Sequence, residues 1–205
     1  MLSVLRHPLG DHIVTHLRDQ TTKPATFRIL AYQLTLMLAI DATRDLPTET
    51  KVVETPLEKT EGSVLTHQPI VVVAILRAGV SMVQPFLDVF PDVSVGYVGL
   101  ERDHATAVAR SYYCKLPSLE GRRVFVVDPM LATGGSASKA LGVVKQNGAV
   151  APRLVCIIAA PEGVAEVARH HSEVSVHVAV LDRALNDRKY ILPGLGDFGD
   201  RLYGT

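Results

Sequence analysis

The chain has little cysteine and no excess of charge of either sign. Only two of its 205 residues are cysteines, Cys114 and Cys156. Both lie in apolar, strand-like segments, which favours reduced thiols in the core over a disulfide framework. The 21 lysines and arginines are balanced by 21 aspartates and glutamates, so the net charge gives no reason to expect nucleic acid as the main partner.

Two kinds of targeting segment are also missing from the sequence pattern. No apolar run reaches membrane-spanning length. Residues 1–18 contain an acidic residue and histidines where a signal peptide needs an apolar core. These observations predict a cytoplasmic protein with no membrane partner.

The apolar content that is present suffices for a full core. Hydrophobic residues make up 47% of the sequence and charged residues 20%, a balance that argues against disorder. There is no internal repeat, low-complexity tract or linker, so residues 1–205 are expected to form a single domain.

The order of the expected elements predicts an α/β fold. Apolar residues recur at helical spacing from Phe27 to Leu38, with Pro24 in the first turn and Pro47 after the end. From residue 69 onwards strands alternate with helices, and the strands are apolar on both faces. This pattern indicates a central, mainly parallel sheet flanked by helices. The expected strands are 70–76, 93–100, 124–127, 153–160 and 174–181, and the expected helices are 80–90, 137–147 and 162–171.

Residues 124–136 carry most of the functional information. An apolar strand runs into Asp128, and a short loop ends in Thr-Gly-Gly-Ser at 133–136, just before a helix-competent stretch. Such a turn offers backbone N–H groups, two hydroxyls and the positive end of a helix dipole to an anion. Its glycines let the backbone approach closely, and Asp128 is placed to meet sugar hydroxyls. The segment therefore indicates a site for a phosphorylated sugar.

A purely structural explanation of this loop stays open, because strand-to-helix turns with glycine and threonine occur throughout α/β proteins. A Walker A loop is excluded, since no GxxxxGK[ST] pattern can be drawn through the segment. The missing lysine argues against nucleoside triphosphate hydrolysis.

The order of strand, acid and TGGS turn resembles the ribose-phosphate loop of type I phosphoribosyltransferases, which bind 5-phosphoribosyl-1-diphosphate (PRPP). Loops of that family usually carry two adjacent acids. Here Pro129 replaces the second acid, and DPMLATGGS is similar to the version in uracil phosphoribosyltransferases. Other segments resemble the same family, in the same order along the chain: 7–9, 17–22, 42–47, 75–79, 98–103, 113–117, 159–163, 185–187 and 190–204.

The resemblance implies a type I phosphoribosyltransferase-like fold with N-terminal helices and a small C-terminal hood that binds the base. It implies transfer of the phosphoribosyl group of PRPP to N1 of uracil, giving UMP and diphosphate. Mg²⁺ would be bound mainly through PRPP, because Pro129 cannot ligate a metal, and no protein metal site is expected. Relatives form homodimers or larger assemblies, and GTP activates some of them.

Arg77 and Arg102 are the two arginines that the resemblance assigns to the diphosphate. Arg77 follows an apolar strand, and Gly79 after it would permit close approach of an anion. Arg102 would lie at the base of a mobile flap, roughly residues 103–112. Both have structural alternatives, since a strand-terminal arginine is usually solvated and Arg102 could form a local ion pair with its acidic neighbours.

The candidate residues for PRPP and for catalysis overlap. The catalytic set is Asp197, Arg77, Arg102 and Asp128. The set expected to bind PRPP comprises Arg77, Ala78, Gly79, Arg102, Asp128, Pro129, Met130, Leu131, Ala132, Thr133, Gly134, Gly135, Ser136 and Asp197.

The glycine-rich tail is the candidate base site. Residues 194–199 formally match GxGxxG, but only six residues follow, too few for a Rossmann unit. Their backbone N–H and C=O groups can match the alternating acceptors and donor on the edge of uracil, whereas cytosine would leave buried groups unpaired. The resemblance places uracil against Ile191, Gly196, Asp197 and Phe198.

Two residues depart from the family pattern, and one pair suggests a metal. Phe198 replaces a small residue, so a ring that points inward would shift the choice of base. Glu101 stands where an aromatic or neutral residue is expected, which affects the geometry of the flap. His12 and His16 have the spacing of a metal-binding pair on a helix, but no third ligand is nearby.

Two other functions remain open. A sister enzyme could transfer the same group to another base, although the GLGDFGD tail argues against this. A pyrimidine-operon type regulator could use the same fold to bind RNA, but the neutral net charge does not support a basic face.

Overall fold

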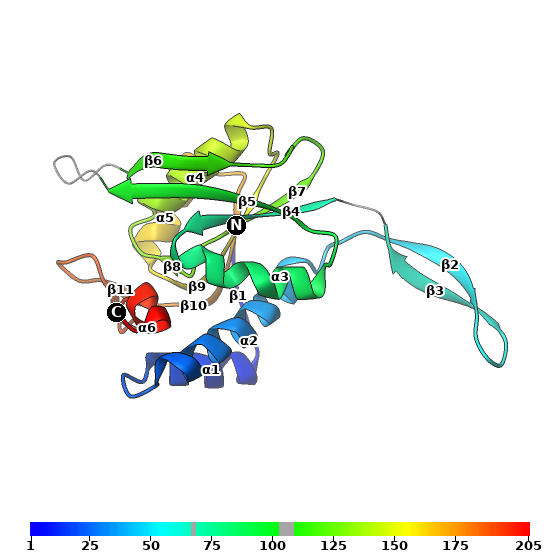
Figure 1. Ribbon diagram of the computed structural model, residues 1–205, viewed down its shortest axis with the longest axis horizontal. Helices are drawn as coiled ribbons and strands as arrows, with labels where there is room; N and C mark the ends of the chain where they lie inside the picture. The colour runs from blue at the N-terminus through cyan, green and yellow to red at the C-terminus, as the bar shows by residue number, and fades with distance from the viewer. Residues whose placement is uncertain (67–68, 103–108) are drawn as a thin grey trace.

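The structure, a computed structural model, describes residues 1–66, 69–102 and 109–205, with the backbone alone for 101, 102 and 109–111. Its centre is an eight-stranded sheet in the order β1-β10-β9-β7-β4-β5-β6, with β8 beside β9 (Figure 1). Every pairing is parallel except that of β5 with β6. The strands are β1 Leu2–Val4, β4 Ile70–Leu76, β5 Ser94–Arg102, β6 Ala109–Lys115, β7 Arg123–Val127, β8 Met130–Leu131, β9 Arg153–Ala159 and β10 Ser175–Leu181.

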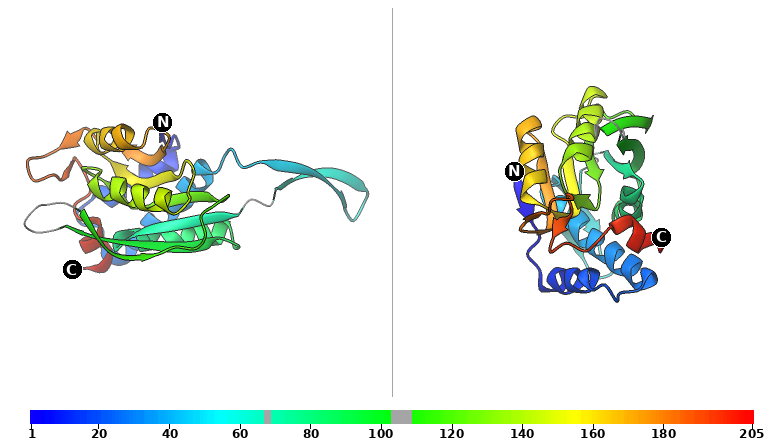
Figure 2. Two further views of the ribbon diagram at one scale, coloured as in Figure 1. Left: turned by 90° about the horizontal axis from the view of Figure 1, so that it is seen from above. Right: turned by 90° about the vertical axis from the view of Figure 1, so that its left-hand side faces the viewer.

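Both faces of this sheet are buried, which explains the continuous apolar strands. Successive residues of β4 alternate between two cores, because side chains point to opposite faces along a strand. Val72 and Ala74 join the core under the N-terminal helices, whereas Val71 and Val73 join the core under α4 and α5. The two helical layers lie on opposite sides of the sheet (Figures 1 and 2). The helices are α1 Pro8–Arg18, α2 Pro24–Ala42, α3 Val83–Val89, α4 Gly135–Gln146, α5 Pro161–His170 and α6 Phe198–Tyr203.

The mainly parallel α/β architecture confirms the expected fold class, and most element boundaries agree to within one or two residues. One expected helix was partly wrong. Residues 80–90 begin as a 3₁₀ helix, Ala78–Met82, and become α-helical only at Val83. Pro85 has no N–H to donate to the carbonyl of Ser81, so a regular α-helical ladder cannot extend through this turn.

A long hairpin between α2 and β4 is the main element that the sequence pattern did not predict. Its strands, β2 Thr48–Glu54 and β3 Lys59–Leu65, pair antiparallel and project away from the body of the protein (Figure 1). All of β2 is exposed, including Val52, which is 63% accessible. No buried face therefore imposes an alternating pattern on this stretch, which is the signal that identifies a strand in sequence.

Helix α2 meets the length and composition test for a membrane-spanning helix, with a mean hydropathy of 1.2. By that measure, the expectation that no segment reaches this length was wrong. Core helices of globular proteins pass the same test, and Phe27, Leu34 and Leu38 of α2 are fully buried in the core beside the sheet.

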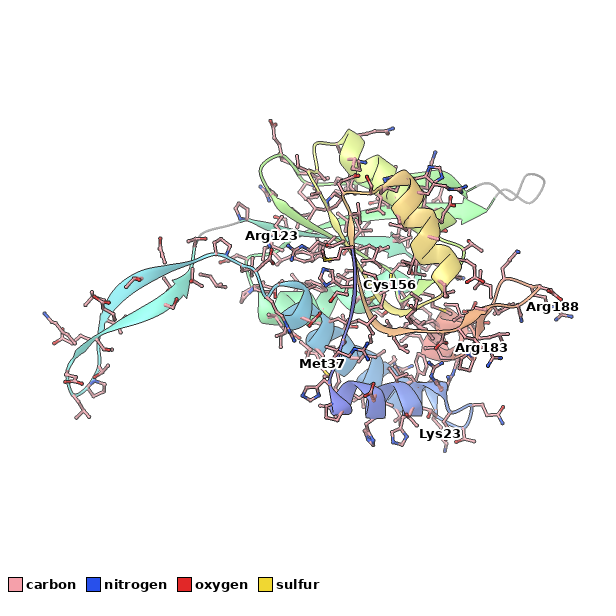
Figure 3. The ribbon with its side chains drawn as sticks, turned by 180° about the vertical axis from the view of Figure 1, so that it is seen from behind. Lys23, Met37, Arg123, Cys156, Arg183 and Arg188 are labelled. Carbon is pink, nitrogen blue, oxygen red and sulfur yellow. The ribbon has the colours of Figure 1, made fainter. Side chains whose placement is uncertain are left out.

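The expected environment of the cysteines was correct for one residue only. Cys156 of β9 is buried inside the sheet (Figure 3). Cys114 of β6 is exposed, because β6 is an edge strand of the sheet. Both thiols are free.

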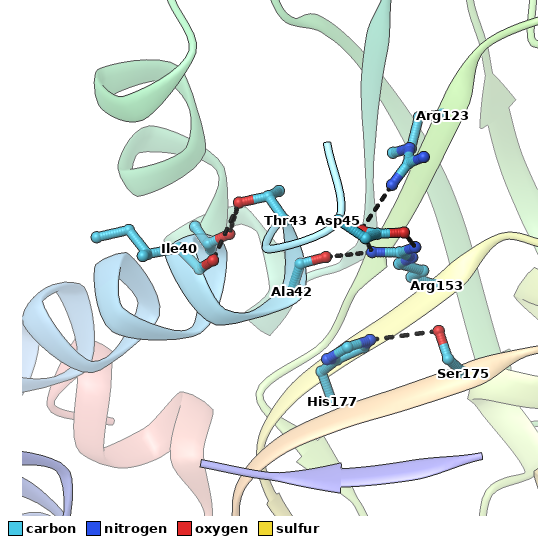
Figure 4. Close-up of polar contacts among 9 residues, drawn as sticks. Ile40, Ala42, Thr43, Asp45, Arg123, Arg153, Ser175 and His177 are labelled. Atoms are coloured by element: carbon cyan, nitrogen blue, oxygen red, sulfur yellow. Dashed lines mark hydrogen bonds and ion pairs between the residues drawn. The ribbon is translucent and has the colours of Figure 1, made fainter. Parts of the chain in front are cut away.

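The amino end of the sheet is fastened by an ionic cluster around Asp45 (Figure 4). Arg153, the first residue of β9, donates to both carboxylate oxygens of Asp45 at 2.7 and 2.5 Å and also to the carbonyl of Ala42 at 2.5 Å. Arg123, the first residue of β7, donates to Asp45 at 2.8 Å. These contacts tie the chain leaving α2 to two central strands, and the hydrogen bonds from Arg153 and Arg123 hold the pKa of Asp45 well below its usual range.

Replacing Asp45 with alanine should destabilise the protein by about 1–2 kcal/mol, more than a simple surface pair, because two arginines lose a shared partner. The depressed pKa means that this stabilisation is present above the unfolded pKa and is lost as the pH falls below about 4. Thermal unfolding at neutral and acidic pH, with the exposed Asp92→Ala as the control, measures the difference. Equal melting temperatures for the two variants at neutral pH would contradict this.

Candidate functional site

The site lies at the carboxyl ends of the central strands, where ligands bind in open α/β sheets. Strands β4 and β7 are parallel neighbours, with Ala74 opposite Val127. Arg77 follows β4 and Asp128 follows β7 directly, so the register brings these two side chains to the same edge. The C-terminal segment covers this edge: a small hairpin of β11 Ala184–Leu185 and β12 Ile191–Leu192, followed by α6.

A cavity of about 480 Å³ forms where the sheet edge meets this C-terminal segment. It brings together three of the four candidate catalytic residues, which come from positions far apart in the sequence. Its lining comprises Arg77, Ala78, Asp128, Pro129, Met130, Asp197, Phe198, Gly199, Asp200, Tyr203 and Thr205. Gly199, Asp200, Tyr203 and Thr205 were not anticipated as site residues. The first three lie in the segment 190–204 that was singled out in the sequence.

Asp128 is the half-buried acid at the bottom of this site. Burial raises the pKa of its carboxyl to about 7, and a hydrogen bond from the backbone N–H of Met130 opposes this effect. A carboxyl with this pKa gains or loses its proton near neutral pH. Small changes in its surroundings can therefore change its charge.

The stability of the free protein should therefore depend on pH through Asp128. The folded state binds this proton more tightly than the unfolded chain, whose reference pKa is 3.8. The resulting stabilisation is complete at pH values below about 4 and is lost as the pH rises to about 7. We expect the melting temperature of the wild type, relative to Asp128→Asn, to fall across this range and then level off. A constant difference between the two proteins would contradict the raised pKa.

The loop after Asp128 is held by backbone pairing with β9. The carbonyl of Pro129 accepts from the N–H groups of Ile157 and Ile158, both at 3.0 Å, and the carbonyl of Leu131 accepts from Ala160 at 2.9 Å. Leu131 is fully buried, so its side chain is not available to a ligand. The path of this loop is thus fixed before any ligand arrives.

At its end the loop leads into the start of α4, Gly135–Gln146. Gly134 is the N-cap of α4, and within the described residues no side chain caps the start of this helix. The carbonyl of Gly134 accepts from Ser138, so the N–H groups of the residues between them lack helical acceptors and can bind an anion. Gly134 has a φ of +83°, and a Cβ here would lie 2.8 Å from the carbonyl oxygen of Gly163. Only glycine fits between this turn and α5.

Arg77 is exposed, and its guanidinium forms no ion pair within the described part of the chain. Gly79 beside it also has a structural role that was not expected from the sequence. It is buried, and an added Cβ would lie 2.5 Å from the carbonyl oxygen of Val127. Close packing of the turn against β7 therefore requires glycine at this position, whether or not an anion approaches it.

Asp197 is exposed, lines the cavity and is the N-cap of α6, where its Oδ1 accepts from the N–H of Asp200 at 3.0 Å. Phe198 follows it, and its ring points into the core rather than towards a ligand. The ring is 1% exposed and packs edge-on against Phe27, with 5.1 Å between centroids. The departure at Phe198 thus fills the core between α6 and α2 and leaves its backbone at the cavity.

Several expected site residues do not line this cavity. Arg102 and Glu101 are described as backbone of β5 only, so their side chains lie outside the described residues, as do positions 103–108 of the expected flap. The antiparallel pairing of β5 with β6 does form the two strands of a hairpin at this position. Residues absent from the cavity lining are Gly79, Leu131, Ala132, Thr133, Gly134, Gly135, Ser136, Ile191 and Gly196.

The described part of the chain contains no group of three or more histidine, cysteine, aspartate or glutamate side chains placed to hold a metal ion. His12 and His16 do contact one another, with ring centroids 4.6 Å apart. At the cavity, the carboxylates of Asp128 and Asp197 are oxygen donors of the kind that Mg²⁺ accepts.

Comparisons with known proteins agree with this geometry. The family model described as uracil phosphoribosyltransferase matches residues 4–205. The chain is 49% identical over 203 residues to the uracil phosphoribosyltransferase of Bacillus pumilus, covering 98% of this chain and 97% of that protein. It is 47% identical over 205 residues to that of Thermus thermophilus, covering 100% and 99%.

Solved structures give the same result at the level of the fold. A protein from Aquifex aeolicus superposes with a TM-score of 0.91 at 40% identity and covers 100% of this chain and 99% of its own. A hypoxanthine-guanine phosphoribosyltransferase from Bacillus anthracis superposes with a TM-score of 0.53 at 14% identity, over 78% of this chain and 80% of its own. This second match supports the type I phosphoribosyltransferase fold alone. By sequence over its whole length, the chain belongs to the uracil phosphoribosyltransferase family.

Proposed function

We propose that this protein transfers the 5-phosphoribosyl group of PRPP to N1 of uracil, giving UMP and diphosphate in pyrimidine salvage. The observation that carries the proposal is the single cavity shared by Arg77, Asp128 and Asp197. Arg77 follows β4, Asp128 follows β7 and Asp197 lies in the C-terminal tail, and each offers a charge suited to a different part of PRPP.

The 5′-phosphate of PRPP would occupy the uncapped start of α4. The turn from Thr133 to Ser136 supplies two hydroxyls and the free N–H groups, and the helix dipole favours the negative charge. Asp128 would accept hydrogen bonds from the ribose hydroxyls. Hydrogen bonds from the ribose hydroxyls would favour the charged form of this carboxyl, whereas burial favours the protonated form in the free protein.

Arg77, the backbone of Ala78 and the side chain of Arg102 would hold the leaving diphosphate. Mg²⁺, bound mainly through PRPP and water, would neutralise part of the charge on that group. The exposed carboxylate of Asp197 is the protein oxygen donor best placed to orient the hydrated ion.

The reaction would loosen the bond from C1 to diphosphate before the base attacks, through an oxocarbenium-like state, as in other glycosyl transfers. We expect no covalent enzyme intermediate, so the protein contributes position and charge. Asp197 is our candidate for the acid nearest the developing positive charge.

Uracil would bind against the tail, next to Ile191 and between Gly196 and Phe198. Gly196 and Asp197 are exposed, and no hydrogen bond within the described part of the chain engages the N–H or C=O of Gly196. These backbone groups can therefore pair with the edge of uracil and discriminate against cytosine.

We further propose that the protein acts in the cytoplasm as a homodimer or larger assembly, with no nucleic acid or membrane partner. Exposed apolar side chains support self-association: Val52 and Leu65 on the projecting hairpin, and Ile29 and Ile40 on α2. Light scattering at micromolar concentration tests this, and a monomer would contradict it. GTP is a candidate activator by analogy with relatives, and its addition to the assay tests that.

The experiment that tests the main proposal measures nucleotide formation by the purified chain from PRPP and Mg²⁺, with uracil, cytosine, hypoxanthine and orotate as parallel acceptors. Activity with uracil alone is the expected result. Activity with another base would retain the PRPP site and overturn the proposed base site, and inactivity with all four would overturn the enzyme function.

A further inference from the structure

Two residues outside the cavity hold the turn that leads into the proposed base site. Asp182 follows β10 directly and is buried, with its side chain 3% exposed. Its two oxygens accept hydrogen bonds from Arg18 at 2.5 and 2.9 Å. Arg18 lies in the last turn of α1, 164 residues away in sequence. Neither residue lines the cavity.

Both members of this ion pair form hydrogen bonds with the backbone of Gly194. Asp182 Oδ2 accepts from the N–H of Gly194 at 2.8 Å, and the guanidinium of Arg18 donates to its carbonyl oxygen at 2.7 Å. The N–H and the carbonyl of one residue, Gly194, are thus both held by one partly buried ion pair. Asp182 is itself fixed, because its N–H donates to the carbonyl of Ala159 at 2.8 Å.

Gly194 has a backbone conformation that these hydrogen bonds help to fix. Its φ is +68°, and a Cβ at this position would lie 2.1 Å from the carbonyl oxygen of Ile191. The chain turns back on itself here, directly after the β11–β12 hairpin. Glycine adopts this conformation freely but loses more entropy than other residues when it is fixed, and the hydrogen bonds with Arg18 and Asp182 offset part of that cost.

A second arginine fixes the next residue. Arg201 of α6 donates to the carbonyl of Leu195 at 2.8 Å, to that of Asp19 at 2.6 Å and to that of Leu17. Its guanidinium also lies 4.6 Å from the centre of the Phe27 ring. Both arginines therefore meet the carboxyl end of α1, whose dipole favours positive charge.

The tail therefore divides into a part whose backbone is held by the rest of the protein and a part that follows it. The carbonyls of Gly194 and Leu195 are occupied by structural contacts, and the backbone from Gly196 to Phe198 comes directly after them. Asp197 and Phe198 of this segment line the cavity, and the hydrogen bonds to Gly194 fix the turn from which the segment starts. We infer that Arg18 and Asp182 are positioning residues for recognition of the uracil base, acting through Gly194, an inference that rests on the proposed base site.

The test compares Arg18→Met with Arg28→Ala. Arg28 also joins a helix to the tail, donating to the carbonyl of Leu202 at 2.8 Å, but it does not touch Gly194. We expect Arg18→Met to raise KM for uracil at least fivefold while KM for PRPP changes by less than twofold. Arg28→Ala should leave both constants within twofold of the wild type.

Loss of Arg18 leaves a buried carboxylate without its partner, which could prevent folding. The double variant Arg18→Met/Asp182→Asn removes both charges and keeps an amide oxygen to accept from Gly194. It should fold and retain the raised KM for uracil, because the carbonyl of Gly194 still lacks its donor. Arg18→Lys should give an intermediate KM, since lysine cannot contact the carboxylate and the carbonyl together.

Hydrogen exchange separates the failure of this inference from the failure of the proposed function. In the double variant, amides of residues 194–198 should exchange at least tenfold faster than in the wild type, with α4 unchanged, whether or not the protein makes UMP. Unchanged exchange in this segment would overturn the inference. Equal increases in KM for uracil and PRPP, or a loss of kcat alone in proportion to the unfolded fraction, would also overturn it.

Discussion

Replacing Asp197 with asparagine should lower kcat for UMP formation at least tenfold and leave the fold intact. The carboxylate lines the cavity with Arg77 and Asp128, and a negative charge there stabilises the positive charge that develops at C1 in the transition state. A tenfold loss corresponds to about 1.4 kcal/mol of transition-state stabilisation, a modest requirement for a charge close to the reacting centre.

The structure makes asparagine an informative substitution because Asp197 has a second role. Its Oδ1 caps α6 through the N–H of Asp200, and asparagine caps a helix about as well as aspartate. The melting temperature should therefore change little while kcat falls. Steady-state kinetics and thermal unfolding measure the two effects, with the exposed Asp187→Asn as the control for loss of one negative charge. An unchanged kcat would show that Asp197 serves only as a helix cap.

Replacing Arg77 with alanine should raise KM for PRPP at least tenfold, with a much smaller change in KM for uracil. Arg77 is exposed at the cavity and forms no ion pair within the described part of the chain, so its charge is available to the diphosphate. The guanidinium can donate two parallel hydrogen bonds to phosphate oxygens, which a single ammonium group cannot reproduce.

Substitution of Arg77 by lysine and by alanine separates the effect of its charge from that of its paired hydrogen-bond donors. Arg77→Lys keeps the charge and loses the paired donors, so it should fall between the wild type and Arg77→Ala. Arg188 lies outside the cavity, in the loop of the small hairpin (Figure 3), and Arg188→Ala is the control for loss of a surface arginine. A normal apparent affinity of Arg77→Ala for PRPP would remove Arg77 from the diphosphate site.

The sequence was informative wherever a short stretch of chain imposes its own pattern. The seven apolar residues of β4 identified a strand buried on both faces, because a parallel sheet between two helical layers leaves no polar face. The TGGS turn at 133–136 was found in the same way, since a helix start with glycine, a preceding acid and no lysine is a local feature. The order of such motifs along the whole chain also identified the family correctly.

Local pattern gave an incomplete explanation, or none, for residues whose contacts are distant in sequence. Gly79 was expected to admit an anion, which stays a prediction, and the sequence did not reveal that packing against the carbonyl of Val127 also requires glycine there. The sequence did not show whether the ring of Phe198 points into the cavity or into the core. Its contact with Phe27 shows that it packs in the core. Arg18 belonged to a recognised motif without a role, because its partners Asp182 and Gly194 are 164 and 176 residues away.

By itself, then, the sequence determined the α/β class and the position of the glycine-containing turn before α4, since periodicity and turn chemistry act over a few residues. The order of motifs along the chain determined the family. Only the tertiary structure decided which side chains share the cavity, where the Phe198 ring lies and what holds Gly194. Those contacts depend on strand register and on the packing of the tail against α1 and α2. Hydrogen bonds between residues far apart in the chain leave no periodic trace in the sequence, because either partner alone looks like an ordinary polar residue.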